Sequence, residues 1–357
     1  MSSAARRRDR RVYLGSHPVL FALLAALRGR PALRLGRTVL VHDAEAYRTA
    51  LTRVPLDRTA AGTTGGAAGE LAGAGALFDQ QGAEHRDARR DVATLLGAAG
   101  IPKLRPIWTK LLDDRLPVLG QGGTVDLVPL AAEIAAATAA ELLNLDADPV
   151  ALARAARVSA ATAARAHLPG PARRMAGRAA ATAAARLVTL IAPAQPADAG
   201  RAVMLAVAAI NTTVAALPRA AAWACDDDLW AYADDPALTD ELLRVTAPTP
   251  LLPRVAAGDA EVGGCPVRTG DRLLLIARHA VEAHHRDPNP ARPAPARTAQ
   301  LVFGAGSHAC PGAALARVQL ADLLAALAPY RPVVVRARAD RLAALPGWRS
   351  LVVRGTT

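Results

Sequence analysis

The chain has 357 residues, 52% of them hydrophobic, and a formal net charge of +12. The charge comes almost entirely from arginine, which with the abundant alanine is typical of a GC-rich genome. The 3% aromatic content is too low for nucleic-acid stacking platforms, so we expect no nucleic-acid partner. The three cysteines, Cys225, Cys265 and Cys310, lie far apart in the chain, which excludes a disulfide framework or zinc site and indicates a reducing cytoplasm.

The chain begins with two segments of contrasting character. Residues 1–11 contain a run of arginines and are predicted to form a disordered basic tail. The apolar run Val19–Leu27 is too short to span a bilayer, and it leads directly into Arg28 and Arg30 without a small-residue cleavage site. We therefore expect a core helix here and no membrane partner.

Helical patterns dominate the rest of the chain. Sequence rich in Ala, Leu and Arg runs from Asp126 to Ala192, with breaks at Asp146–Pro149 and Leu168–Pro171, and an apolar helix is predicted at Asp198–Leu217. The predicted strands are short: Ala32–Leu35, Thr38–Val41, Glu261–Val267, Arg272–Ile276, Val333–Val335 and Leu351–Val353. No repeat or linker divides residues 1–357, so we expect a single mainly helical domain with small β-sheets at its edge.

Two charged pairs lie on predicted helices. His85 and Arg89 are four residues apart and therefore share one helix face. Glu241 and Arg244 are about one turn apart and can form an ion pair on one face. Each pair in isolation is typical of a solvated surface, so its meaning depends on the motifs around it.

The most informative stretch is Phe303-Gly304-Ala305-Gly306-Ser307-His308-Ala309-Cys310-Pro311-Gly312, which precedes a predicted amphipathic helix. A cysteine just before a helix has its thiolate favoured by the helix dipole and exposed amides. Gly304 and Gly306 permit turns that a side chain would forbid, and they allow close approach to a flat ligand. Pro311 suits the first turn of a helix, where no amide donor is needed.

This loop resembles the haem-binding loop of the cytochrome P450 family, whose pattern is Phe-Gly-x-Gly-x-(His or Arg)-x-Cys-x-Gly. Every specified position is filled, by Phe303, Gly304, Gly306, His308, Cys310 and Gly312. The resemblance implies a haem b cofactor whose iron is held by the thiolate of Cys310. It extends over nearly the whole chain in the family's order, and it implies a cytochrome P450-like helical fold.

The resemblance also assigns residues around the haem and beneath the loop. The implied donors to the haem propionates are His85, Arg89, Arg254 and His308. The implied structural cluster is Glu241, Arg244 and an arginine of the irregular segment, for which we choose Arg297 over Arg292. The implied substrate pocket is lined by Ala60–Gly82 and Thr249–Leu252.

The stretch Ala208–Thr213 is similar to the family's oxygen-activating helix. The threonine of that motif is retained as Thr212, but its acidic position is filled by Asn211. A carboxylate exchanges protons with water, whereas a neutral amide only orients water. Thr212 and Asn211 are therefore the expected catalytic positions, and Asn211 is a departure from the family.

The resemblance implies a haem-thiolate monooxygenase that oxidises a small organic or natural-product biosynthetic intermediate with O2. Its electrons would come from a ferredoxin and a ferredoxin reductase, with the acidic ferredoxin docking on the arginine-rich face near Cys310. The departure at Asn211 leaves open an alternative in which the same fold performs peroxide-driven oxidation, oxidative coupling or cyclisation. A third alternative is a non-catalytic haem-binding protein.

Overall fold

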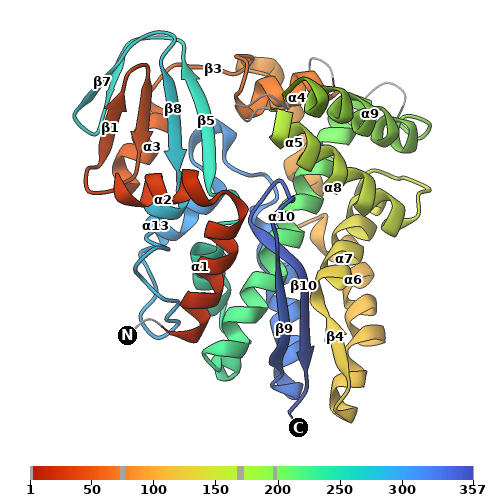
Figure 1. The fold of residues 1–357 in the computed structure, drawn as a ribbon. Coiled ribbons are helices and arrows are strands. Elements are labelled where there is room, and N and C mark those ends of the chain that lie inside the picture. Colours follow the sequence, from red (N-terminus) through yellow and green to blue (C-terminus); the bar gives the residue numbers. More distant parts are fainter. Residues whose placement is uncertain (1–2, 73–76, 167–172, 196–198, 357) are drawn as a thin grey trace.

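The computed structural model describes residues 3–72, 77–166, 173–195 and 199–356, and it forms a mainly helical molecule whose larger sheet lies on one side (Figure 1). The helices are α1 (Ala4–Ser16), α2 (Pro18–Ala26), α3 (Ala44–Thr52), α4 (Thr64–Ala72), α5 (Gly82–Leu96), α6 (Ile101–Arg115), α7 (Leu127–Leu142), α8 (Pro149–Ala166), α9 (Arg173–Ile191), α10 (Ala199–Asp226), α11 (Pro236–Thr246), α12 (Ala277–Ala280), α13 (Ala296–Ala299) and α14 (Ala313–Leu327). The strands are β1 (Ala32–Leu35), β2 (Thr38–Val41), β3 (Leu56–Asp57), β4 (Thr124–Asp126), β5 (Leu251–Ala256), β6 (Ala260–Val262), β7 (Cys265–Val267), β8 (Arg272–Ile276), β9 (Val333–Asp340) and β10 (Gly347–Arg354). The predicted fold class, mainly helical with small sheets, is confirmed.

The larger sheet has five strands in the order β1-β2-β8-β5-β3, and its β2 and β8 strands are parallel. The predicted strand Glu261–Val267 divides into β6 and β7, because Gly263 and Gly264 adopt positive φ angles of 56° and 78° and reverse the chain. Strands β9 and β10 form a second sheet with β4 and are longer than predicted. Polar residues such as Arg336 and Arg338 extend β9, since their side chains face solvent.

The alanine-rich helices α7, α8 and α10 pack against one another on the other side of the molecule (Figure 1). Their buried faces carry small side chains such as Ala135, Ala156 and Ala206. Small contact residues allow helix axes to approach closely. Larger side chains such as Ile134, Leu152 and Ile210 are buried as well. The predicted break at Asp146–Pro149 is the link from α7 to α8, whereas the predicted break at Leu168–Pro171 lies outside the described residues.

Two predicted helices are present with altered extent or burial. The predicted core helix Val19–Leu27 is α2, which buries Phe21 and Leu24 but leaves Val19 and Leu23 exposed. The helix predicted at Asp198–Leu217 is α10, which continues to Asp226. By length and composition α10 is long and apolar enough to cross a membrane, but 50% of its apolar window is buried inside the molecule.

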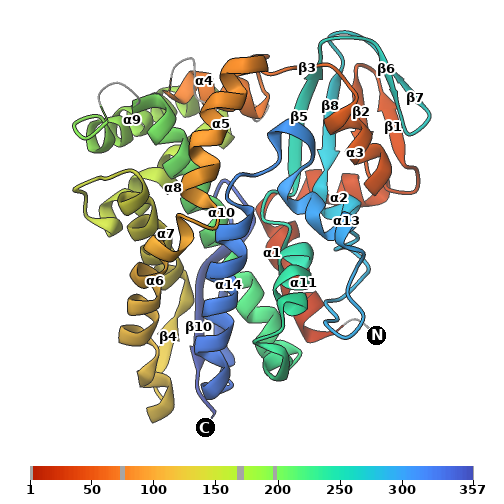
Figure 2. The ribbon, with the colours of Figure 1, turned by 180° about the vertical axis from the view of Figure 1, so that it is seen from behind.

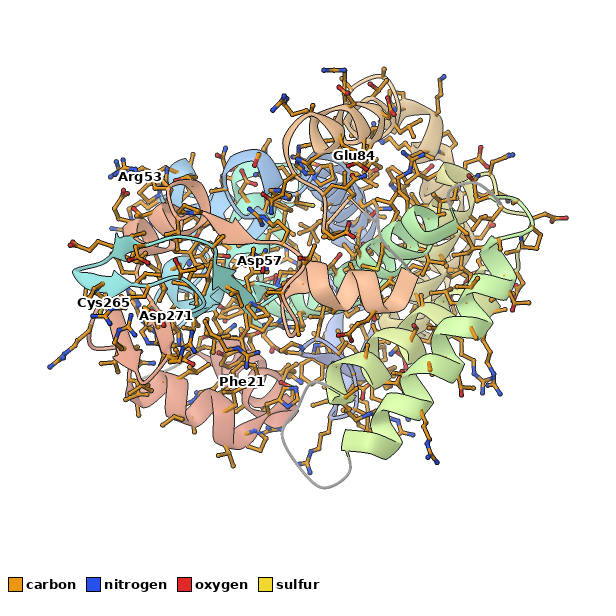
Figure 3. The ribbon with its side chains drawn as sticks, turned by 90° about the horizontal axis from the view of Figure 1, so that it is seen from above. Phe21, Arg53, Asp57, Glu84, Cys265 and Asp271 are labelled. Carbon is orange, nitrogen blue, oxygen red and sulfur yellow. The ribbon has the colours of Figure 1, made fainter. Side chains whose placement is uncertain are left out.

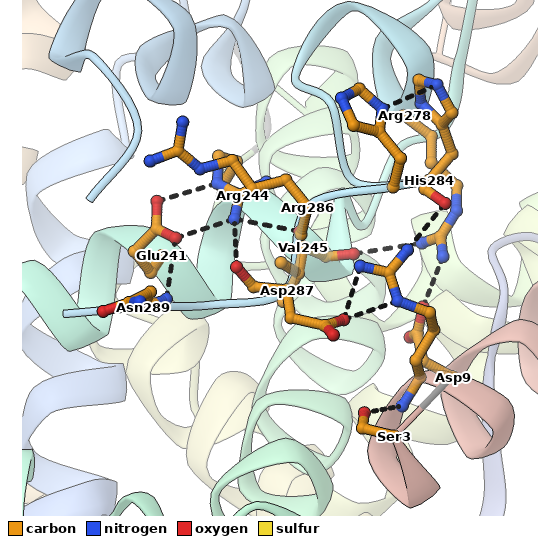
Figure 4. Close-up of polar contacts among 12 residues, drawn as sticks. Ser3, Asp9, Glu241, Arg244, Val245, Arg278, His284, Arg286, Asp287 and Asn289 are labelled. Atoms are coloured by element: carbon orange, nitrogen blue, oxygen red, sulfur yellow. Dashed lines mark hydrogen bonds and ion pairs between the residues drawn. The ribbon is translucent and has the colours of Figure 1, made fainter. Parts of the chain in front are cut away.

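The prediction of a disordered tail over residues 1–11 is wrong for the residues described there, because α1 is an ordered helix. The Ser3 side chain caps it by accepting a hydrogen bond from the Arg6 amide at 3.0 Å. Asp9 is buried between two arginines, with its oxygens 2.6 Å from both Arg219 and Arg278. The carboxylate neutralises two guanidinium groups inside the core, which docks α1 against α10 and the segment after β8. Figure 4 shows Asp9 beside one of the two arginines, Arg278.

Candidate functional site

The Cys310 loop closes on itself ahead of α14. The Cys310 amide donates a hydrogen bond to the Phe303 carbonyl at 2.7 Å. Gly304 and Gly306 have φ angles of 77° and 72°, which only glycine adopts without strain, so both glycines are required by the backbone. The Arg317 guanidinium lies over the Phe303 ring, 4.7 Å from its centroid, and holds the loop against the first turn of α14. The loop therefore presents Cys310 from a rigid turn.

The Cys310 side chain reaches the surface, yet protein atoms surround it on its other sides. Desolvation raises the pKa of the Cys310 thiol, although a hydrogen bond from the Gly312 backbone and the charges of Arg89 and Arg317 oppose this rise. The expected effect of the helix start on the thiolate is thus present, but it is smaller than desolvation. Leu96 at the end of α5 lies next to Gly312 and joins α5 to the loop.

A cluster of cationic and imidazole side chains, the cationic cluster, lies beside the Cys310 loop. Its members are His85, His308, Arg58, Arg89 and Arg254, of which Arg58 was not predicted from the sequence. The rings of His85 and His308 stack with centroids 3.9 Å apart and planes 21° apart. Desolvation first, and then the positive charges of Arg58, Arg254 and Arg89, lower the pKa of His308 to about 3. Both rings are therefore neutral at pH 7 and can donate one hydrogen bond each.

The cationic cluster has no carboxylate of its own in the described part of the chain. The side chains of Arg58 and Arg89 form no hydrogen bond or ion pair there. Arg254 donates to the Thr64 hydroxyl and the Pro253 carbonyl, both at 2.8 Å, and its buried Nε has no partner. Burying uncompensated cations is unfavourable unless an anion joins them. The two carboxylates at one edge of a haem fit this donor set, and the neighbouring Cys310 fits the iron.

The predicted ion pair Glu241–Arg244 is present and buried, with a shortest N–O distance of 2.7 Å (Figure 4). Desolvation would raise the pKa of Glu241, but Arg244 and the amides of Ala294 and Asn289 outweigh it and keep the pKa below its usual value. Arg244 also donates to the carbonyls of residues 281, 286 and 287. The pair therefore holds the irregular segment that leads to the Cys310 loop.

The prediction that Arg297 completes this cluster is wrong. The Arg297 side chain is exposed on α13. The backbone carbonyl of Arg297 accepts a hydrogen bond from the Arg48 side chain at 2.7 Å. The alternative, Arg292, is exposed as well. Two backbone amides fill the positions around the Glu241 carboxylate that a third side chain would need, so no arginine is required there.

Asn211 and Thr212 lie half-buried on α10, and both donate to backbone carbonyls. The Asn211 amide donates to Val207 at 2.8 Å and, across the interface to α8, to Ala156 at 3.3 Å. The Thr212 hydroxyl donates to Ala208 at 2.7 Å. Asn211 therefore joins two helices, a role that the sequence did not suggest. Among the residues that the structure describes, no hydrogen bond connects these two side chains to the cationic cluster.

The predicted pocket lining is described except for residues 73–76 of Ala60–Gly82. Within it, α4 packs on α10 through Ala68 and Met204, with Phe78 against both. The adjoining segment 249–252 enters β5, whose next residues carry Arg254. These contacts place α4 over the α10 face and near the cationic cluster.

Comparison with known families identifies one match, to a profile described as cytochrome P450, over residues 236–328. The chain is 41% identical over 88 residues to mycocyclosin synthase of Mycobacterium tuberculosis. The aligned segment covers 23% of this chain and 22% of that protein. It is 37% identical over 105 residues to luteothin monooxygenase of Streptomyces thioluteus, covering 26% and 24%. These matches span less than a quarter of the length of either relative.

Solved structures match over nearly the whole chain. CYP108D1 of Novosphingobium aromaticivorans is 21% identical, covers 100% of both chains and has a TM-score of 0.76. CYP109E1 of Bacillus megaterium, solved in complex with testosterone, is 16% identical, with 96% of this chain and 99% of that chain covered and a TM-score of 0.76. At these identities the likeness shows the fold alone.

Proposed function

The chain belongs to the cytochrome P450 family, and from that membership we propose that it is a haem-thiolate monooxygenase acting on a small organic or natural-product intermediate. The observation that carries the proposal is the cationic cluster, whose three guanidinium groups have no carboxylate partner among the described residues and adjoin the Cys310 loop. In a monooxygenase, one atom of O2 enters the substrate and the other leaves as water, with two electrons and two protons consumed.

The proposed cofactor is haem b. Cys310 would hold the iron, and the propionates would be bound by His85, Arg89, Arg254 and His308. When bound, the haem supplies one-electron and oxygen chemistry, to which a thiolate ligand contributes electron density. A metal-bound thiol is deprotonated, so the raised pKa of the free Cys310 thiol is no obstacle. Thr212 keeps its acceptor capacity while it donates to Ala208, and it can therefore hold a water at the surface of α10.

A second candidate is oxidative coupling, cyclisation or peroxide-driven oxidation by the same site. Asn211 favours it, because a neutral amide engaged with Val207 and Ala156 cannot take up and release a proton. The similarity to a protein named mycocyclosin synthase supports this candidate, whereas similarity to luteothin monooxygenase supports the first. With a substrate in hand, incorporation of isotopically labelled oxygen from O2 into the product would separate the two.

The proposed electron donors are a ferredoxin and its reductase. Arg86 is exposed on α5, the helix whose Leu96 adjoins Gly312, and it offers positive charge to an acidic ferredoxin. The three cysteines are free, which supports a reducing, cytoplasmic location.

The proposed haem ligation is tested by the spectrum of the reduced protein with carbon monoxide. Wild-type protein should show the red-shifted Soret band of thiolate-ligated haem. Cys310→Ser should lose the band, and Cys265→Ser in strand β7 should keep it. Wild-type protein that is purified with haem but lacks the band would contradict the assignment of Cys310.

A further inference from the structure

Helix α2 is apolar on every side. Its sequence, Pro-Val-Leu-Phe-Ala-Leu-Leu-Ala-Ala, contains no polar side chain. Phe21 and Leu24 form its inner side and are buried in one apolar cluster with Leu40 of β2 and Ile276 of β8. Figure 3 shows α2 at the edge of the molecule, with Phe21 on its inner side. The larger sheet therefore covers one side of α2 only.

The other side of α2 is an apolar surface, the α2 outer face. It consists of Val19, Ala22, Leu23 and Ala26, which recur at the helical period and therefore lie side by side. All four are exposed, and Val19 and Leu23 keep 82% and 51% of their surface accessible. A helix that is apolar all round is normally buried in a protein core or in a membrane. The α2 outer face meets neither condition in the free chain, and contiguous exposed apolar surface of this kind marks an interaction site.

The chain on both sides of the α2 outer face is cationic. Four flanking arginines are exposed, two on the outer side of α1 and two directly after α2: Arg10, Arg11, Arg28 and Arg30. Their side chains form no hydrogen bond or ion pair within the part of the chain that the structure describes. The sequence between Asp9 and Asp43 contains no carboxylate. Asp9 is paired inside the core, and Asp43 caps α3, so neither neutralises these arginines.

Two other occupants fit the α2 outer face less well than lipid does. A second copy in a symmetric contact would bring the same arginines of both chains together, and like charges repel. A folded partner protein makes about one hydrogen bond per 100–200 Å² of interface, whereas no side chain of α2 can donate or accept one. The acyl region of a lipid layer needs no hydrogen bonds, and anionic headgroups complement the flanking arginines.

We infer that α2 lies on the surface of an anionic lipid layer, with Val19 and Leu23 among the acyl chains and Arg28 and Arg30 at the headgroup phosphates. With nine residues α2 is too short to span a bilayer, but lying in the interface requires no spanning length. The inference replaces the expectation that the chain has no membrane partner, which rested on spanning alone. It is independent of the proposed haem chemistry, and it fits a cytoplasmic protein because the inner leaflet carries anionic lipids.

The test is cosedimentation of the purified protein with vesicles of phosphatidylcholine alone or mixed with phosphatidylglycerol. Wild type should bind the mixed vesicles at low ionic strength and bind phosphatidylcholine much less. Added salt should release it, because screening weakens the attraction between arginines and headgroups. Binding to the mixed vesicles should weaken on the order of tenfold or more in Val19→Ser/Leu23→Ser, which removes the inserted apolar groups. It should weaken on the order of tenfold in Arg28→Gln/Arg30→Gln, which removes the charges.

The matched control is Leu342→Ser, which removes a 68% exposed leucine from the turn between β9 and β10. It should bind the mixed vesicles as wild type does. A further variant, Ala22→Glu, places a carboxylate within the α2 outer face without removing a large apolar side chain, and it should also weaken binding. Because all the substituted side chains are exposed, the variants should unfold at the wild-type Tm.

Three outcomes would overturn the inference. The first is wild-type protein that stays in the supernatant with the mixed vesicles, and the second is binding of the α2 variants equal to that of Leu342→Ser. The third is a wild-type dimer, seen by sedimentation velocity without lipid, that Val19→Ser/Leu23→Ser dissociates, because a second copy would then cover α2. Vesicle binding is measured as protein, so a chain that lacks haem would contradict the proposed function and leave this test unaffected.

Discussion

Replacing Asp9 by Asn should strongly destabilise the protein. The Asp9 carboxylate is 4% exposed and accepts from Arg219 Nε at 3.0 Å and Nη2 at 2.6 Å, and from Arg278 Nη2 at 2.6 Å. Desolvation would raise the pKa of Asp9, but the two guanidinium charges outweigh it and keep the pKa below its usual value. Asparagine removes the charge and places an amide N–H against a guanidinium. Breaking a buried ion pair by removing one partner costs about 3–5 kcal/mol, and here two cations lose the same partner.

The assay is urea unfolding of wild type, Asp9→Asn and the control Asp228→Asn. Asp228 also forms a two-oxygen pair, with Arg331, but the two side chains are 66% and 52% exposed. Exposed pairs contribute about 0–1 kcal/mol, and Asn tolerates the positive φ of 49° at position 228, so this control should lie close to wild type. An unfolding free energy for Asp9→Asn within about 1 kcal/mol of the control would refute the docking of α1 through Asp9.

Three further outcomes are expected. Changing both Arg89 and Arg254 to Gln should lower haem occupancy more than either change, since each charge-assisted bond contributes about 1.5–3 kcal/mol; unchanged occupancy in the double variant would mean that these donors are misplaced. Asn211→Asp places a carboxylate against two carbonyl oxygens, so it should lower the free energy of unfolding in urea by about 1–3 kcal/mol. If the variant is instead as stable as wild type and forms more product per electron, this position serves proton delivery. Desolvation lowers the pKa of His279 to about 3 and of His284 to about 4, below the usual 6.5, so the unfolded chain binds more protons than the folded protein at acidic pH. The protein should therefore keep its stability above pH 6.5 and lose it as the pH drops toward 4. A Tm that does not change over that range would contradict this expectation.

The features of the site that depend only on residues near one another in the sequence were predicted correctly. The positive φ angles of Gly304 and Gly306 follow from the residue type, and the Glu241–Arg244 pair follows from spacing within one helix. The extents of β1, β2 and β8 agree with the apolar runs bounded by turn residues. These features depend on neighbours within a few positions, which the sequence displays directly.

The parts that depend on distant contacts were missed. Asp9 stands in a run of arginines and looks solvated, and only the fold brings Arg219 and Arg278 to it. Arg297 was expected beside Glu241, but backbone amides lie there, and every residue type except proline can offer one.

The alanine interfaces of α7, α8 and α10 have a consequence for how this protein can evolve. A single base change turns an alanine codon into one for valine, glycine, serine, threonine, proline, aspartate or glutamate, and never into one for leucine, isoleucine or phenylalanine. At buried positions such as Ala135 and Ala156, glycine costs about 1 kcal/mol in helix propensity, a larger side chain overpacks the contact by about 1–3 kcal/mol, and a charge is worse. Most single-base changes at these buried alanines therefore destabilise the protein, and replacing one by a large aliphatic side chain requires more than one base change.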